Sequence, residues 1–494
     1  MKLDRKRAKV IRYGAYAALI GPLLVGAPQS FAQDAELSKS EPLRLTVTPH
    51  EHSRIAMKTM PKAVCMLHAE GDSDPSRAFK VFADDEGMIR FHVNPSDESE
   101  EVAAFAVDCT AGGKTRTFPL QLRAQIIPSA DMPAPAVETR EPQESDVVRP
   151  ALTYGEAVQL SDDEVLRREY PPRPNANQAP GAFANWLRLV TQPARRVEAR
   201  QAEHSELRAS NLVQNSNNWS GYALENAPNE VPVATYDLVE GAWYVPTVTN
   251  PLYEQMTYSV FWVGLDGDSG VCPKYCPGNG KTADLWQAGT GQQLESLPLR
   301  AIATTASAAE ANTAKASTAK ANTANLIAII PPVLTPTYTF STYFAWTELV
   351  PGQSIMVLPN FNVSPGDEVL VEVWVGNKTG NPTLSGQNGV AFVEDVTKGE
   401  YTYVYTPIGS VKVLGYQAEW IMERPYENGV LPGLADYTST YMYLPWTEKT
   451  DGTWLSYDQN NNQPITMVNS TDNAMSTAIS IDTNTIWFVW YSHN

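Results

Sequence analysis

The sequence predicts an all-β protein, with a large antiparallel β-sandwich preceded by a small β-sandwich and a helical segment. Three observations support this prediction. After Asn211, aromatic and β-branched runs alternate with turn residues at strand-like spacing. Residues 42–127 show the same alternation in shorter runs. Between these two regions, an arginine-rich stretch carries the start signal of a helix.

The N-terminus reads as an export signal. Six Lys or Arg residues precede an apolar run at 15–27, and Ser30-Phe31-Ala32 offers a small-x-small cleavage site. We therefore expect a mature chain that begins near Gln33 and is secreted, whether extracellular or periplasmic. An uncleaved anchor is the alternative, although Gly21 and Pro22 interrupt the run.

Composition divides the mature chain into four parts. Residues 33–127 form a small β unit, 128–150 a linker rich in Pro, Ala and Glu, 151–210 a basic helical segment, and 211–494 the large sandwich. A low-complexity run at 301–325 interrupts the sandwich. Because an exported protein meets oxidising conditions, we expect disulfides Cys65–Cys109 and Cys272–Cys276, which keep each bond within its own region.

The basic segment predicts two helices. Ser161 is followed three residues later by Glu164, as in a capping box, and the helix that it starts should end at Tyr170-Pro171-Pro172. A second helix is expected at 182–190. An arginine-rich segment before an acidic domain can dock on it near neutral pH and loosen as carboxylates protonate, as an inhibitory propeptide would. A solvated linker helix is the alternative.

The large sandwich is short of histidine and rich in acid. From Asn211 onward it holds one histidine, His493, and 26 Asp plus Glu against 10 Lys plus Arg. This region therefore has too few histidines for a Ser-His-Asp triad, a Cys-His dyad or a histidine-based zinc site, and acid-base chemistry in it must use carboxylates. Cys272 and Cys276 would lack two further zinc ligands. We expect no metal and no cofactor.

The net charge of −18 argues against nucleic acid and anionic membranes as partners. A region with few cations also gains little net positive charge when its carboxylates protonate, so acid unfolds it less. The composition suits a protein that works in acid.

Polar residues recur beside tryptophan on the predicted strands. Alternate residues of a strand share a face, so the following pairs lie together: Gln287 with Leu285, Glu423 with Glu419, Trp346 with Glu348, and Trp262 with Asp266. This pattern favours one sheet face that forms a cleft.

Six separated motifs resemble the glutamic peptidases, the eqolisin family. In order they are NWSGY at 218–222, GAWYVPTV at 241–248, FWVGLDGD at 261–268, LWQAG at 285–289, FAWTE at 344–348 and AEWIME at 418–423. The resemblance implies two curved antiparallel sheets, a concanavalin-like sandwich, and an acid endopeptidase that is made with a signal and a propeptide. It implies polypeptide substrates, and we expect a monomer that its own propeptide inhibits.

The family's catalytic glutamine and glutamate fall on Gln287 and Glu423. An ionised Glu can take a proton from water and return it to the leaving amine, while a Gln amide donates to the oxyanion at any pH. The resemblance also implies a site shaped by Trp219, Trp262 and Trp346, with Asp266 and Glu348 as polar support. Gly291 departs from the pattern, which has an aspartate there; Asp284 or Asp268 could replace it.

Three other readings stay open. Asp268-Ser269-Gly270 is similar to a pepsin-type signature, but no second copy exists in the chain. A glycoside hydrolase or lectin would use a similar aromatic-lined sandwich, although Glu419 and Glu423, about 13 Å apart along one strand, exceed either glycosidase spacing. A binding protein without catalysis is the third.

Overall fold

The computed structural model describes fourteen stretches of the chain, and every structural statement below concerns these residues. They are 42–49, 52–72, 78–99, 102–125, 147–204, 207–208, 216–225, 234–252, 255–267, 284–298, 337–376, 387–411, 413–459 and 462–494. Several predictions lie outside them: the export signal, most of the linker, the Cys272–Cys276 bond, Asp268-Ser269-Gly270 and the run at 301–325. No helix in the described part of the chain has the length and apolarity to cross a membrane.

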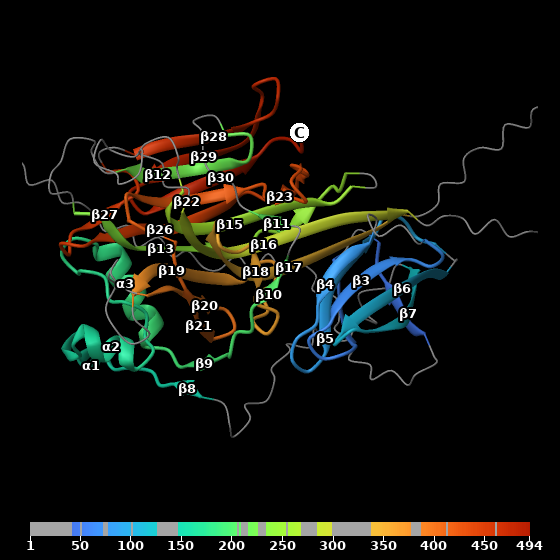
Figure 1. Cartoon of the computed structure of the whole chain (residues 1–494), viewed down its shortest axis with the longest axis horizontal. Coiled ribbons are helices and arrows are strands. Elements are labelled where there is room, and N and C mark those ends of the chain that lie inside the picture. Colours follow the sequence, from blue (N-terminus) through green and yellow to red (C-terminus); the bar gives the residue numbers. More distant parts are fainter. Residues whose placement is uncertain are drawn as a thin grey trace, which may run out of the picture.

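The C-terminal region is a sandwich of two sheets, as the sequence predicts (Figure 1). Sheet 1 has the order β12 (Trp219–Glu225), β22 (Gln417–Glu423), β15 (Thr257–Asp266), β16 (Leu285–Pro298), β17 (Thr337–Val350), β18 (Met356–Val357) and β10 (Ala202–Glu203). The neighbours in this order are all antiparallel.

Sheet 2 has the order β21 (Glu400–Pro407), β20 (Asn388–Asp395), β19 (Glu368–Gly376), β13 (Tyr236–Tyr244), β26 (Thr440–Lys449), β30 (Thr485–Trp490), β29 (Ala474–Asp482) and β28 (Asn462–Val468). Because β28 pairs with both β29 and β12, it joins the two sheets at one edge. Shorter pairings complete the sandwich: β27 (Trp454–Ser456) with β26, β24 (Gly433–Leu434) with β15, and β14 (Val248–Thr249) with β25 (Asp436–Tyr437).

The main hydrophobic core lies between the two sheets and includes Trp286, Trp420, Phe261 and Phe488. All ten residues of β15 are buried, because one face of this strand meets the core and the other face is also covered. This explains why the central strands read as continuous apolar runs in place of a simple alternation.

The N-terminal unit, residues 42–125, contains β1 (Leu43–Val47), β2 (Ser53–Lys58), β3 (Val64–Ala69), β4 (Phe79–Phe82), β5 (Met88–Pro95), β6 (Val102–Ala111) and β7 (Lys114–Ala124). Five strands form one sheet in the order β1-β7-β6-β3-β4, in which β1 and β7 are parallel and the other neighbours antiparallel. The antiparallel pair β2 and β5 extends sheet 1, because β5 pairs with β17.

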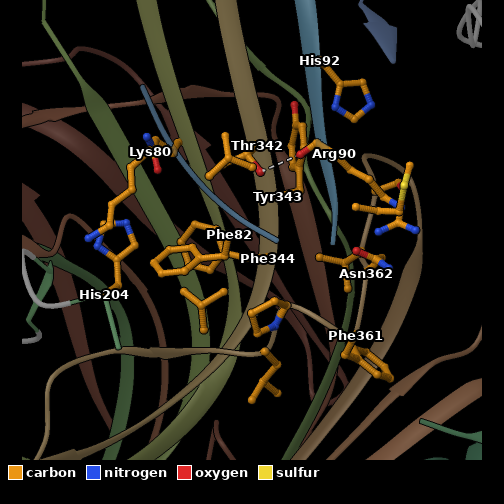
Figure 2. A pocket seen from close by; sticks show the side chains of 18 of the residues that line it. Lys80, Phe82, Arg90, His92, His204, Thr342, Tyr343, Phe344, Phe361 and Asn362 are labelled. Atoms are coloured by element: carbon orange, nitrogen blue, oxygen red, sulfur yellow. Dashed lines mark hydrogen bonds between the residues drawn. The ribbon is translucent and has the colours of Figure 1, made fainter. Parts of the chain in front are cut away.

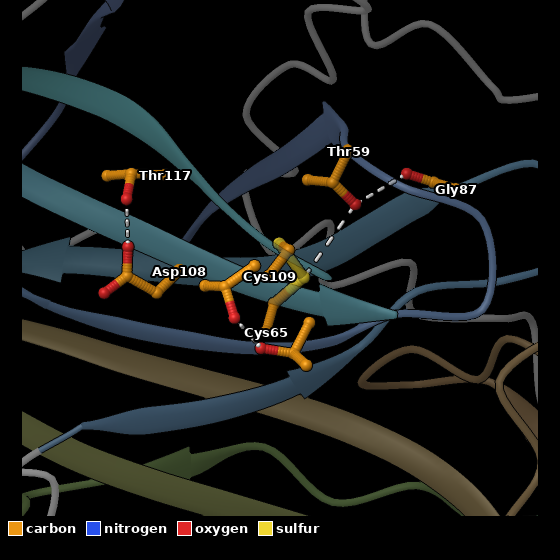
Figure 3. Close-up of a disulfide and its surroundings, with 8 residues drawn as sticks. Thr59, Cys65, Gly87, Asp108, Cys109 and Thr117 are labelled. Atoms are coloured by element: carbon orange, nitrogen blue, oxygen red, sulfur yellow. Dashed lines mark hydrogen bonds between the residues drawn. A yellow bond between two sulfur atoms is a disulfide. The ribbon is translucent and has the colours of Figure 1, made fainter. Parts of the chain in front are cut away.

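The predicted disulfide Cys65–Cys109 is confirmed. It joins directly opposite residues of β3 and β6, with an S–S distance of 2.05 Å (Figure 3). The same unit shares a hydrophobic cluster with sheet 1, since Leu297, Tyr338 and Phe340 pack with it.

The helical segment, residues 147–200, holds α1 (Tyr154–Gln159), α2 (Asp162–Arg167) and α3 (Pro180–Val190), with β8 (Val148–Arg149) and β9 (Ala194–Arg196). The Ser161–Glu164 capping box is present. Thr153 and Glu156 form a second one at α1, a helix that sequence reasoning missed although these two residues have the same spacing. Helix α3 confirms the predicted second helix. It packs on the outer face of sheet 2, against residues such as Leu370 and Trp374 (Figure 1).

Ion pairs accompany this docking. Arg149 is buried and contacts both carboxylate oxygens of Glu394 on β20, at 2.8 and 2.9 Å. Arg188 pairs with Glu368 at 2.5 Å, and Arg195 pairs with Glu400. The helices therefore sit on the face of the sandwich that is opposite to sheet 1.

Candidate functional site

The outer face of sheet 1 carries the predicted polar and aromatic residues, and we call it the site face. Side chains of directly opposite residues in antiparallel strands lie on the same side of a sheet. Gly264 of β15 stands opposite Gln287 and Glu419, and Gln287 stands opposite Glu348. Two residues along, Trp262 is level with Trp346 and Ile421; two further, Val260 is level with Glu423 and Trp219. Gln287 and Glu423 therefore share one face, separated by β15.

Gln287 is held by its neighbour on β17. Its Nε2 donates to Glu348 Oε2 at 2.9 Å, and the side chain has no exposed surface. An amide NH₂ group carries two N–H bonds, so one remains for a second acceptor. Its Oε1 is buried and has no hydrogen-bond partner among the described residues. Glu348 thus orients the amide, and the amide keeps unused donor and acceptor capacity.

Glu423 accepts two side-chain N–H groups, one on each carboxylate oxygen. Trp262 Nε1 donates to Oε2 at 2.9 Å, and Asn218 Nδ2 donates to Oε1 at 3.1 Å. Ser216 in turn fixes Asn218, because its Oγ donates to Asn218 Oδ1 at 2.8 Å. Two donors suit an ionised carboxylate, which can only accept. Sequence reasoning missed the part of Asn218, although this residue directly precedes Trp219 in the matched motif.

The indole of Trp262 extends along the site face from Glu423 to Gly264, the residue of β15 that stands opposite Gln287. Its N–H end meets Glu423, and its far edge lies over Gly264, where an added Cβ would come within 2.8 Å of Cζ3. Only glycine leaves room for the ring at that position. Trp219 meets Trp262 edge to face, with ring centroids 4.9 Å apart. These packed rings fix Trp262, and through it the carboxylate.

Gly291, where the resemblance expects an aspartate, lies beneath an aromatic ring. A Cβ at Gly291 would come within 2.4 Å of two ring carbons of Phe344 on the neighbouring strand. Phe344 therefore occupies the space that an aspartate would need. Asp284, the described one of the two substitutes considered, precedes β16.

Asp266 lies at the end of β15 and binds backbone. Its carboxyl accepts from the N–H groups of Leu414, Gly415 and Tyr416 at 2.5, 3.0 and 2.6 Å. Burial raises the pKa of Asp266 to about 6, although these N–H groups oppose the rise. The contacts hold the turn that leads into β22, the strand that carries Glu423.

A stretch of chain that precedes the sandwich crosses the site face. We call residues 201–204 and 207–208 the crossing segment. At one edge, β10 pairs with β18, and His204 N donates to Ile355 O at 2.8 Å. Towards the other edge, β11 (Leu207–Arg208) pairs with β23 (Tyr426–Glu427), which follows β22. Leu207 is fully buried in the same apolar cluster as Trp219, Trp262 and Trp346. Nothing in its sequence marked this role.

His204 and the N-terminal unit cover one end of the site face. The His204 ring lies 5.4 Å from Phe82 of β4 and 6.3 Å from both Tyr258 and Phe344 of sheet 1. A cavity of about 50 Å³ lies beside it, with room for a few waters, lined by residues of both units including Lys80, Arg90, His92 and Tyr343 (Figure 2). Burial, together with nearby Arg54, lowers the pKa of His92 to about 3.

The described residues contain no group of three or more His, Cys, Asp or Glu side chains that could hold a metal ion. The site face brings together the carboxylate of Glu423 with its two donors, the amide of Gln287 oriented by Glu348, the carboxylate of Glu419 and a set of packed indoles.

Comparisons with known proteins show the family of the chain. A family model described as the peptidase A4 family matches residues 217–323 and 335–488. Among solved structures, scytalido-glutamic peptidase with a peptide-based transition-state analogue is 17% identical, covers 56% of this chain and 98% of its own, and has a TM-score of 0.36. SCP-B, an eqolisin peptidase in complex with the tripeptide Ala-Ile-His, is also 17% identical with the same coverage and a TM-score of 0.35. No curated protein sequence matches the chain.

Proposed function

Because the chain belongs to the peptidase A4 family, the glutamic peptidases or eqolisins, we propose that it is a secreted acid endopeptidase that uses Glu423 and Gln287. The family model matches more than half of the chain and includes both residues. A glutamic-type peptidase hydrolyses polypeptide substrates. The finer assignment of roles rests on the site face.

Glu423 is the proposed general base and acid. Its carboxylate takes a proton from water as the water attacks the peptide carbonyl, and then returns that proton to the leaving amine. The N–H groups of Trp262 and Asn218 hold the carboxylate in one orientation. An oriented base loses little entropy on reaching the transition state.

Gln287 is the proposed donor to the oxyanion. Glu348 uses one of its two N–H bonds, and the other is available to the oxygen that becomes negative. An amide does not titrate, so this donor survives in acid. One such donor is typically worth about 3 kcal/mol of transition-state stabilisation. The substrate carbonyl would lie over Trp262, between the two groups.

The observation that carries this proposal is that the Glu423 carboxylate accepts two hydrogen bonds and lies on the same sheet face as the oriented amide of Gln287. Trp219 and Trp346 would bound the substrate, with Glu348 orienting Gln287 and Asp266 positioning β22.

We propose further that the chain is made as an inactive precursor. The crossing segment lies on the site face, and Leu207 is buried in the same apolar cluster as Trp219, Trp262 and Trp346. Cleavage between Arg196 and Asn215 would free the site. Intact-mass analysis of acid-treated protein should find a fragment that ends in this range, and an uncut yet active chain would contradict the precursor proposal.

The catalytic proposal is tested by Glu423→Gln, with the exposed Asp451→Asn as control. Each protein is incubated with an unfolded protein substrate from pH 2 to 7, with and without a pepsin-type inhibitor. We expect wild type and Asp451→Asn to digest the substrate in acid despite the inhibitor. Glu423→Gln should fold, as judged by circular dichroism, and lose turnover. Turnover retained by this variant would rule out the assigned role.

A further inference from the structure

The crossing segment contacts sheet 1 through its backbone as an extended peptide would. Ile355 contributes both of its backbone groups: its carbonyl accepts from His204 N at 2.8 Å, and its N–H donates to Leu207 O at 3.3 Å. On the other side, Leu207 and Arg208 form an antiparallel pair with Tyr426 and Glu427. Peptide-binding proteins commonly hold a ligand in this way, with backbone bonds for affinity and pockets for side-chain selection.

The side chain of Leu207 enters the site face. It has no exposed surface, and it belongs to an apolar cluster with Val260, Ile421 and Ile355 as well as the three tryptophans. Glu423 stands level with Val260 on the neighbouring strand, so this apolar space adjoins the proposed catalytic carboxylate. An aliphatic side chain is the chemistry that such a space favours, and a charged one would lose its hydration there.

The position of the segment in the chain keeps Leu207 close to the site. Eight residues after Arg208 the chain reaches Ser216, whose hydroxyl fixes Asn218 and hence Glu423. The segment is therefore tethered beside the site at high effective concentration, and it needs little intrinsic affinity to fill the subsite until it is cut.

We propose that Leu207 occupies the place of a substrate side chain, and that the space it fills is the subsite that selects an aliphatic residue of the substrate. The inference rests on the proposed function and adds its specificity. His204, packed between Phe82, Tyr258 and Phe344, marks a neighbouring aromatic-lined position three residues earlier.

Digestion of a peptide library by the acid-treated full-length protein tests the inference. We expect Leu, Ile or Met to be enriched at one fixed position relative to the cleaved bond, and Asp and Lys to be depleted there. Cleavage without an aliphatic preference at any position would overturn the assignment.

Competition with synthetic peptides sharpens the test. A peptide with the sequence of residues 202–208 should raise the apparent KM for a library substrate. Its Leu207→Ile analogue should inhibit within a few-fold of it, and its Leu207→Asp analogue about 10- to 100-fold more weakly, because the burial of an aliphatic side chain is lost. Equal inhibition by the Leu and Asp peptides, or inhibition by neither, counts against the inference.

Variants of the full chain separate this inference from the proposed function. Leu207→Asp should speed the appearance of activity in acid, whereas Leu207→Ile and the exposed Glu198→Gln should not. If Glu423→Gln retains turnover, the catalytic proposal fails and the subsite with it. Only the subsite assignment fails if Glu423→Gln is inactive, Leu207→Asp gains activity in acid no faster than wild type, and the Asp peptide inhibits as strongly as the Leu peptide.

Discussion

Replacing Trp262 by Phe tests how the carboxylate is held. The substitution removes the Nε1–H that donates to Glu423 Oε2 at 2.9 Å and keeps an aromatic ring in the same buried place. A hydrogen bond to a charged group contributes about 1.5 to 3 kcal/mol, which corresponds to a factor of about 10 to 150. We expect kcat/KM to fall by this factor. Because the lost donor stabilised the ionised form, the acid limb of the pH–rate profile should also move to higher pH.

Trp219→Phe is the matched control. Trp219 is equally buried and packs against Trp262, but its Nε1 has no hydrogen-bond partner among the described residues. The control therefore loses the same ring volume without a bond to the carboxylate. Rates of peptide hydrolysis from pH 2 to 7 compare the two variants. Equal losses in both, with the acid limb unmoved in Trp262→Phe, would refute the reasoning.

Three further predictions concern stability and packing. Burial raises the pKa of Asp237 and of Glu295 to about 8. Such groups stabilise the folded protein fully below about pH 4 and lose this contribution as pH rises through 8. The thermal unfolding midpoint of the inactive Glu423→Gln protein should therefore decrease as the pH is raised from 4 to 8, and an increase would contradict the argument. Arg149→Met leaves the buried Glu394 without its cation. We expect the unfolding free energy of the full chain, measured by chemical denaturation near pH 7, to fall by about 3 to 5 kcal/mol. A change under about 1 kcal/mol would be inconsistent with a buried ion pair. Gly264→Val should displace the Trp262 ring and reduce kcat. Gly352→Ala, at an exposed position where a Cβ would meet only van der Waals contacts at 3.5 Å, should leave kcat unchanged. An active Gly264→Val protein would show that the ring is not needed where it lies.

Local signals predicted much of the fold. The strands around Trp346 and Glu423 carry aromatic and β-branched residues typical of a sheet, and the Ser161 capping box fixes the start of α2. Parity along each strand also predicted that Glu423 and Glu419 would share a face, which register confirms. These inferences depend on residues that are close in sequence.

Long-range contacts were beyond such reasoning. The pairing of β11 with β23 joins residues more than 200 positions apart, and nothing local marks Leu207 as a residue of the site face. The space over Gly264 likewise becomes meaningful only once Trp262 is seen to fill it.

Charge pattern alone also gave an incomplete account of the helical segment. Arginines do meet carboxylates there, yet Glu240 and Glu372 lie opposite each other on the sheet face beneath the segment, and burial raises the pKa of both well above the ordinary range. Groups that are protonated while buried favour the docked state in acid. They oppose the loosening that attraction between opposite charges would predict.

The cluster shared by sheet 1 and the N-terminal unit bears on how the enzyme is produced. Strand β17 supplies Trp346 to the site and, at its other end, Tyr338 and Phe340 to the packing of the N-terminal unit. A recombinant protein that starts at residue 211 would present those rings to water beside the edge of β17 that β5 covers, a combination that promotes aggregation. We expect soluble protein only when the N-terminal unit is produced together with the sandwich. We also expect the two chains that result from cleavage to stay associated as one complex.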